Sequence, residues 1–186
     1  MTLEERLESV PEALAQYEFL SVIDTIYELV GQANLVAEIQ PGWYVYLGIA
    51  QYFSSRFEDA ISSYSLAIKL DAKNLPANMN LAYLLACCPD PFYHNAKFAI
   101  KHAKRGCRIT HWKEWHGPQN LATAYARSGN FKAADRYVQK AYKLAPANLQ
   151  WRVTRLIECF RKEEPYTACL EDDKRKLSDD WDRTSK

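Results

Sequence analysis

The strongest constraint on this chain is an internal repeat. Residues 44–74 read YVYLGIAQYFSSRFEDAISSYSLAIKLDAKN, and residues 118–148 read PQNLATAYARSGNFKAADRYVQKAYKLAPAN. Both segments align without gaps, and each has the pattern of two short amphipathic helices joined by a tight turn. The aligned pairs include Leu47 with Leu121, Gly48 with Ala122, Phe57 with Phe131, Ala60 with Ala134 and Ala67 with Ala141. Self-similarity over such a length is typical of helical-repeat proteins.

The matched positions have packing roles. Small residues are expected where the two helices of a hairpin approach closely: Gly48, Ala82 and Ala122 on first helices, and Ala60, Ala99 and Ala134 on second helices. Phe57 and Phe131 are expected to fill the helix–helix junction. Gly129 and Asn130 are expected to form a turn, because positive φ is inexpensive there. Pro146 is expected to stop the second helix.

A further copy of the pattern lies between these two segments. Leu81 follows Leu47 by 34 residues, and a second amphipathic helix reads AKFAIKHAKRGCRI. Five extra residues separate the two helices of this copy, within the stretch PDPFYHN. Because Pro89 and Pro91 cannot lie inside a helix, the sequence predicts an enlarged turn.

The repeat resembles the tetratricopeptide repeat family, whose 34-residue motif combines small, aromatic and proline positions in this order. The third copy matches the motif at Leu121, Ala122, Tyr125, Gly129, Phe131, Ala134, Ala141 and Pro146. The first copy matches at Tyr44, Leu47, Gly48, Phe57, Ala60, Tyr64 and Ala67, and departs from it at Gln51, Ser55 and Ala72. The resemblance implies an all-α fold, a right-handed α-α superhelix of helical hairpins with flanking helices.

The middle copy resembles a variant of this family from planctomycete-type bacteria, through the stretches NLAYLLACCPDP and THWKEW. The resemblance covers about residues 41–166. It predicts three repeats, over residues 41–74, 75–114 (with the enlarged turn) and 115–148.

The N-terminal flank, residues 1–40, is predicted to be helical. Thr2 to Glu5 and Ser9 to Glu12 read as capping boxes that open helices. Apolar residues between Leu14 and Val30 form one helical stripe. Two interpretations stay open for this stripe, a single long helix and a degenerate earlier repeat. In either case it is expected to cover the open end of the first repeat.

The C-terminal flank divides into two parts. Residues 149–165 are predicted to form a capping helix, with Leu149, Val153, Leu156, Ile157 and Phe160 on one face. Residues 166–186 form a charged tail that is expected to be frayed, with Trp181 exposed.

Composition narrows the functional classes. The formal net charge of the 186 residues is +1, which argues against a large electrostatic footprint for nucleic acid. The N-terminus lacks the apolar core of a secretory signal, and no apolar run is long enough to span a membrane. Five irregularly spaced cysteines argue against a disulfide framework and favour a reducing cytoplasm.

One stretch has residues that suit metal or thiol chemistry, between Cys87 and His111. It contains Cys87, Cys88, His94, His102, Cys107 and His111. Their spacing lacks the two close pairs of a zinc site, and the adjacent cysteines lie at a helix end rather than a helix start. The sequence therefore predicts no catalytic residues, no metal ligands and no cofactor, and a zinc or thiol site here is a minor alternative.

The resemblance implies a concave groove lined by the first helix of each repeat. Chaperone-binding members place Lys and Asn where this chain has Val45 and Ile49, so a carboxylate clamp is not supported. The residues expected to contact a partner are Tyr46, Ile49, Tyr52, Phe53, Asn80, Tyr83, Asn120 and Arg127.

The predicted function is a non-catalytic interaction module that presents this partly aromatic groove to a peptide or helix of a partner protein. Neither nucleic acid nor membrane is an expected partner. Two alternatives remain for the apolar patch: the N-terminal helix covers it, or a second copy of the chain covers it in a homo-oligomer.

Overall fold

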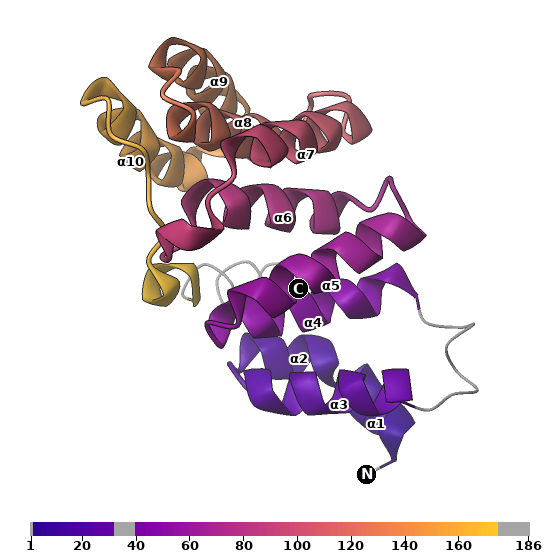
Figure 1. Cartoon of the computed structure of the whole chain (residues 1–186). Helices are drawn as coiled ribbons and strands as arrows, with labels where there is room; N and C mark the ends of the chain where they lie inside the picture. Colours follow the sequence, from indigo (N-terminus) through magenta and orange to yellow (C-terminus); the bar gives the residue numbers. More distant parts are fainter. Residues whose placement is uncertain (1, 32–39, 175–186) are drawn as a thin grey trace. The chain divides into compact units, whose positions relative to one another are not determined.

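The computed structural model describes residues 2–31 and 40–174 (Figure 1). Regular structure in these residues is entirely helical, which confirms the all-α prediction. The elements are α1 (Leu3–Glu8), α2 (Val10–Ala15), α3 (Phe19–Gly31), α4 (Pro41–Phe53), α5 (Phe57–Leu70), α6 (Leu75–Cys87), η1 (Pro91–Tyr93), α7 (Ala96–Ile109), α8 (His116–Arg127), α9 (Phe131–Leu144), η2 (Ala147–Leu149) and α10 (Gln150–Arg161).

The chain forms two compact units. The first, here called the terminal unit, comprises residues 1–72 and 169–186, and contains α1 to α5. The second, here called the central unit, comprises residues 73–168 and contains α6 to α10.

The N-terminal stripe is not one long helix. The chain breaks between α2 and α3, where Tyr17 has a φ of 65°. Both helices then bury their apolar faces in one core, with Val10 and Leu14 from α2 and Ile23 and Ile26 from α3. The break is absent from the periodicity because both helices keep their apolar residues on the shared side.

The two predicted capping boxes had different outcomes. The Thr2 side chain accepts from the Glu5 backbone and the Glu5 carboxylate accepts from the Thr2 backbone, so the first box is confirmed. The second is wrong, because Ser9 makes no side-chain cap. Its backbone is helical, and its hydroxyl donates instead to the Arg6 carbonyl at 2.8 Å.

Helices α4 and α5 form the hairpin predicted from the first copy, and Gly48 lies where α5 packs closely against α4. A Cβ atom on Gly48 would lie 2.5 Å from the Tyr64 ring, which is buried in the same hairpin. The small residue is therefore required, as predicted. At the turn, Ser55 adopts a φ of 61°, a conformation that glycine adopts more easily.

The central unit contains two further hairpins, α6 with α7 and α8 with α9, as the sequence predicts. Its four close-contact alanines are fully buried: Ala82, Ala99, Ala122 and Ala134. The enlarged turn is confirmed, since α6 ends at Cys87, the short helix η1 follows, and α7 begins at Ala96. Gly129 has the expected positive φ of 78°, and α9 ends two residues before Pro146.

Helix α10 packs on α9 through the predicted apolar face. The chain after α10 differs from the expected frayed tail as far as residue 174. Tyr166 and Ala168 are buried in the central unit, and Asp173 is buried in the terminal unit, where residues 170–174 are helical. Trp181 and the rest of the predicted tail lie outside the described residues, as do residues 32–39 of the N-terminal flank.

Candidate functional site

The eight predicted contact residues divide evenly between the two units. Tyr46, Ile49, Tyr52 and Phe53 lie on α4 in the terminal unit, whereas Asn80 and Tyr83 lie on α6 and Asn120 and Arg127 on α8 in the central unit. The four residues of the terminal unit and the four of the central unit have different surroundings.

The α4 residues are largely used within the terminal unit. Phe53 stacks on Phe19 with ring centroids 5.0 Å apart, and Tyr46 lies 5.8 Å from Trp43. Tyr46, Ile49 and Phe53 are partly buried against the core that α2, α3 and α4 share. The N-terminal helices thus cover part of the patch, which is one of the two alternatives considered above.

Tyr52 is buried, and its hydroxyl donates to Asp173 Oδ2 at 2.9 Å. Near it in the terminal unit, Tyr17 donates from its hydroxyl to the Lys174 carbonyl at 3.2 Å. Residues 173 and 174 therefore accept hydrogen bonds from two tyrosines of the terminal unit, one of which, Tyr52, was predicted to contact a partner.

Asn120 of α8 forms a hydrogen bond between the two hairpins of the central unit. Its side-chain amide donates to the Met79 carbonyl of α6 at 2.9 Å, and the side chain is buried. The bond adds to the one that the Met79 carbonyl accepts within α6, and it links α8 to α6, so Asn120 acts in the fold. Asn80 is half-buried, and Tyr83 packs against the core of the central unit.

Arg127 makes three side-chain hydrogen bonds. Its Nε donates to the Ala86 carbonyl at 2.6 Å, and its Nη2 donates to the Tyr166 carbonyl at 2.8 Å and to Thr167 Oγ1 at 3.2 Å. Burial lowers the pKa of the guanidinium from its ordinary value, but that value is so high that the charge persists at neutral pH. Arg127 therefore binds an extended backbone with charge-assisted hydrogen bonds.

That backbone belongs to residues 165–168, here called the strap. The strap has no regular secondary structure, and the Ala168 amide donates to the Cys87 carbonyl of α6 at 2.7 Å. The Tyr166 ring is 7% exposed, and the Arg155 guanidinium lies 5.7 Å from its centroid. Helices α6 and α8 thus bond to two backbone positions of an extended segment, and the aromatic ring of that segment is buried in the core of the central unit beside Arg155 of α10.

Sequence reasoning missed the strap, although a signal was present. Tyr166 is an aromatic residue in a charged stretch, and Pro165 biases the preceding residue toward an extended backbone. The hydrogen bonds of the strap reach residues about 40 or more positions away, and periodicity carries no information about such contacts.

The candidate thiol and histidine residues do not converge on one another. His94 donates from Nε2 to the Cys88 backbone carbonyl at 2.8 Å rather than facing the thiol. Burial raises the pKa of the Cys88 thiol to about 11, so the thiol is protonated at neutral pH. His102 donates from Nδ1 to Asn78 Oδ1 at 3.0 Å, and burial lowers its pKa to about 4.

The remaining members of this set have separate surroundings. Burial also raises the pKa of the Cys107 thiol to about 11, and the thiol packs closely on Gly117 of α8. Cys87 donates to the Tyr83 carbonyl of its own helix, and His111 is exposed. Over residues 2–31 and 40–174, no group of three or more His, Cys, Asp or Glu side chains could hold a metal ion.

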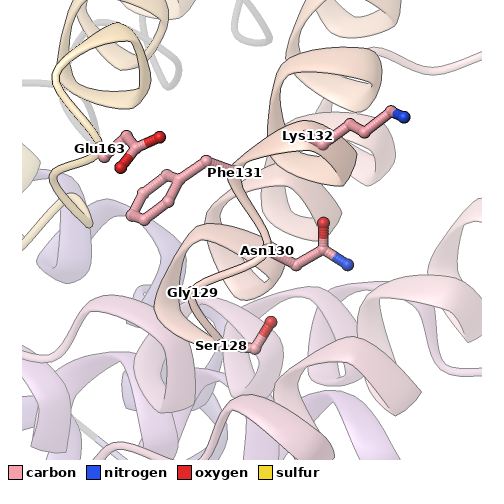
Figure 2. Close-up of a pocket in the computed structure, with 6 residues that line it drawn as sticks. All are labelled: Ser128, Gly129, Asn130, Phe131, Lys132 and Glu163. Atoms are coloured by element: carbon pink, nitrogen blue, oxygen red, sulfur yellow. The ribbon is translucent and has the colours of Figure 1, made fainter.

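A shallow depression lies beside the turn between α8 and α9. Figure 2 shows that the Phe131 ring and the Glu163 carboxylate face each other across it, while Lys132 and Asn130 point away. Ser128 and Gly129 complete its lining. None of the eight predicted residues lines this depression, and its polar side chains do not converge on a common point.

No protein-family model matches the chain, and no match was found among curated proteins. None of the helices in the described part of the chain is long and apolar enough to cross a membrane.

Proposed function

We propose that this chain is a non-catalytic protein-binding module built of tetratricopeptide-like hairpins in a right-handed superhelix. Three hairpins of similar helix length support this proposal: α4 with α5, α6 with α7, and α8 with α9. Their close contacts use the small residues that the repeat places at equivalent positions. A cytoplasmic location fits the five cysteines, which are all free thiols.

The observation that carries the proposal is the way α6 and α8 hold the strap. Arg127 donates to a strap carbonyl, the Cys87 carbonyl accepts from a strap amide, and the Tyr166 ring is buried in the core of the same unit. Backbone bonds with one aromatic anchor are a common way to recognise an extended peptide. Because Arg127 is one of the residues predicted to face a partner, the strap behaves as an intramolecular model of the ligand.

The chemistry of these contacts defines the ligand. It is an extended segment with an aromatic residue, followed two positions later by a small residue whose amide is free to donate. The aromatic side chain supplies most of the apolar burial, while the two backbone bonds set the register. A helix would not fit these contacts, because its interior backbone groups are already paired.

The experiment measures binding of a labelled peptide with the sequence of residues 162–168 to the full chain. In the Tyr166→Ala variant the strap loses its anchor, so the site opens and accepts the tyrosine of the added peptide. We expect this variant to bind the peptide at least about ten-fold more tightly than the wild-type chain, in which the tethered strap competes at high effective concentration.

Two controls define the site. Adding Arg127→Gln to Tyr166→Ala should abolish peptide binding, and a peptide with alanine in place of its tyrosine should not bind the Tyr166→Ala chain. Failure of the Tyr166→Ala chain to bind the peptide, with helical circular dichroism retained, would contradict the proposal that α6 and α8 form a peptide site.

A further inference from the structure

The charges of this chain are segregated between its two units. Residues 73–168, the central unit, carry 16 Lys and Arg against 6 Asp and Glu. The rest of the chain carries 8 Lys and Arg against 17 Asp and Glu. The near-neutral net charge of the whole chain is therefore the sum of a strongly basic unit and a strongly acidic one. The expectation that the chain binds no nucleic acid rested on that net charge.

Within the central unit, the basic residues concentrate on α7 and α9. Helix α7 has no acidic residue, and its cations are Lys97, Lys101, Lys104, Arg105 and Arg108. Helix α9 has one acid, Asp135, and its cations are Lys132, Arg136, Lys140 and Lys143. Across the described ranges none of these nine cations forms an ion pair.

The spacing of these cations opposes helix stability. Lys97 with Lys101, Lys104 with Arg108, and similar pairs on α9 stand four residues apart on the helix surface, where like charges repel. Acids at these spacings would stabilise the helices instead. Since the described residues supply no neutralising partner, the arrangement suits an external polyanion.

Aromatic rings lie among the cations. Tyr137 stacks between Tyr125, at 5.5 Å and an interplanar angle of 2°, and Trp112, at 6.0 Å and 21°. Lys104 of α7 lies 5.6 Å from the Tyr125 ring, and Lys140 of α9 lies 4.4 Å from the Trp112 ring. This aromatic ladder therefore connects the basic side chains of both helices into one surface, here called the basic face.

Phe98 provides the observation that selects among polyanions. Its ring is 48% exposed on α7, and Lys101 lies 5.7 Å from its centroid. An exposed ring beside a cation is a platform on which an unpaired base can stack while its phosphate meets the charge. An acidic polypeptide has carboxylates for the lysines but no general use for the ring.

We propose that the basic face of α7 and α9 binds single-stranded nucleic acid, with phosphates on the lysines and arginines and a base on Phe98. Helices α7 and α9 are second helices of their hairpins, whereas α6 and α8 hold the strap, so this surface is distinct from the proposed peptide site (Figure 1). Phosphate attraction gives affinity without sequence preference, and the acidic terminal unit repels the strand.

The test uses fluorescence anisotropy of the full chain with labelled oligouridylate and oligothymidylate of about 15 nucleotides. We expect binding with Kd of about 1 to 100 µM near physiological salt, weakening steeply as salt rises. Comparing the two strands separates an RNA from a DNA preference, because only the former has the 2′-hydroxyl.

Charge variants locate the surface. The triple variant Lys97→Gln, Lys101→Gln and Arg108→Gln is matched by Lys69→Gln, Arg161→Gln and Lys162→Gln, which removes the same charge from exposed sites elsewhere. We expect the first triple to bind about ten-fold or more weakly and to lose about two units of the logarithmic salt slope. Equal losses in both triples would overturn the assignment to the basic face.

A ring variant tests the nucleic-acid assignment. Phe98→Leu keeps an apolar side chain but removes the stacking face, and Phe92→Leu is its control, since Phe92 is 84% exposed outside α7. We expect Phe98→Leu alone to weaken binding by about five-fold or more. The assignment fails if neither strand binds at low salt, if both ring variants bind like the wild type, or if polyglutamate of equal charge competes as well as unlabelled strand.

Discussion

At the scale of single residues, two equivalent turn positions differ in how well their residues suit the backbone. Ser55 and Gly129 occupy the same place in their hairpins, with φ values of 61° and 78°. Glycine adopts positive φ without steric cost, whereas another residue pays roughly 1–2 kcal/mol. The departure of the first copy from the repeat motif is thus a local strain.

Ser55→Gly is expected to raise the free energy of unfolding by about 0.5–1 kcal/mol, because relief of the strain exceeds the added entropy of the unfolded chain. Urea denaturation followed by circular dichroism measures the change. Ser54→Gly is the matched control, since Ser54 has a φ of −88° and glycine relieves nothing there. A stabilised Ser54→Gly or a destabilised Ser55→Gly would contradict the argument.

His102 is the residue whose titration should affect stability most clearly. Burial, followed by the charges of Arg105 and Lys101, lowers its pKa from 6.5 to about 4. The folded state disfavours the protonated ring. The contribution of His102 to the free energy of unfolding is therefore fully present above pH 6.5 and is lost as the pH drops toward 4.

The expected loss between pH 7 and pH 5 is about 1–2 kcal/mol more in the wild type than in His102→Gln. Urea denaturation at both pH values gives the comparison. His94, whose pKa burial also lowers, is present in both proteins and so cancels. Identical pH dependence in the two proteins would show that His102 does not titrate as its surroundings require.

At the scale of elements, hairpin packing depends on what surrounds each small residue. A Cβ on Gly48 would meet the Tyr64 ring, which is rigid and buried. A Cβ on Gly106 would meet the Met79 side chain, whose flexible thioether can rotate away. Two glycines inside helices therefore tolerate alanine to different extents.

Gly48→Ala is expected to lower the free energy of unfolding by about 1–2 kcal/mol, since overpacking outweighs the helix propensity that alanine adds. Gly106→Ala should change it by less than about 0.5 kcal/mol, because the two effects nearly cancel. Thermal and urea unfolding of both variants measure the difference. The reverse order of the two variants would refute this account of the α4–α5 contact.

At the scale of the whole molecule, charge segregation should make stability depend on salt. The α7 cations repel one another, and salt screens this repulsion. Neutralising Lys97, Lys101 and Arg108 removes like-charge pairs that cost roughly 0.2–0.5 kcal/mol each.

We therefore expect the triple glutamine variant to be more stable than the wild type by about 1 kcal/mol at low salt, with a smaller gain at high salt. Urea denaturation at two NaCl concentrations provides the measurement. A variant that is less stable at low salt would mean that these cations are neutralised within the chain.

Much of the fold was predictable because its determinants are local. Each of these determinants acts within its own hairpin, so the sequence alone locates it. They are the small residues Gly48, Ala82 and Ala122, the proline pair after Cys87 and the Gly129 turn. The break at Tyr17 was not predictable, because no glycine or proline marks it and the apolar stripe continues across it.

The candidate site was less predictable than the fold. The sequence identifies Arg127 as a residue of interest but not its ligand, since the Tyr166 carbonyl lies 39 residues further along the chain. Asn120 and Tyr52 were assigned to a partner, yet they bond to Met79 and Asp173. The hydrogen-bond partner of a polar group on a helix face is set by the other elements that pack against that face, so it cannot be read from the helix alone.

The sequence by itself therefore determined the helices of the three hairpins, their pairing and the enlarged turn, because periodicity and small-residue spacing encode contacts between neighbours in the chain. Only the tertiary structure decided where the strap binds, which of the eight residues serve the fold, and how the charges divide between units. These depend on contacts between distant residues, whose positions follow from packing rather than from local pattern.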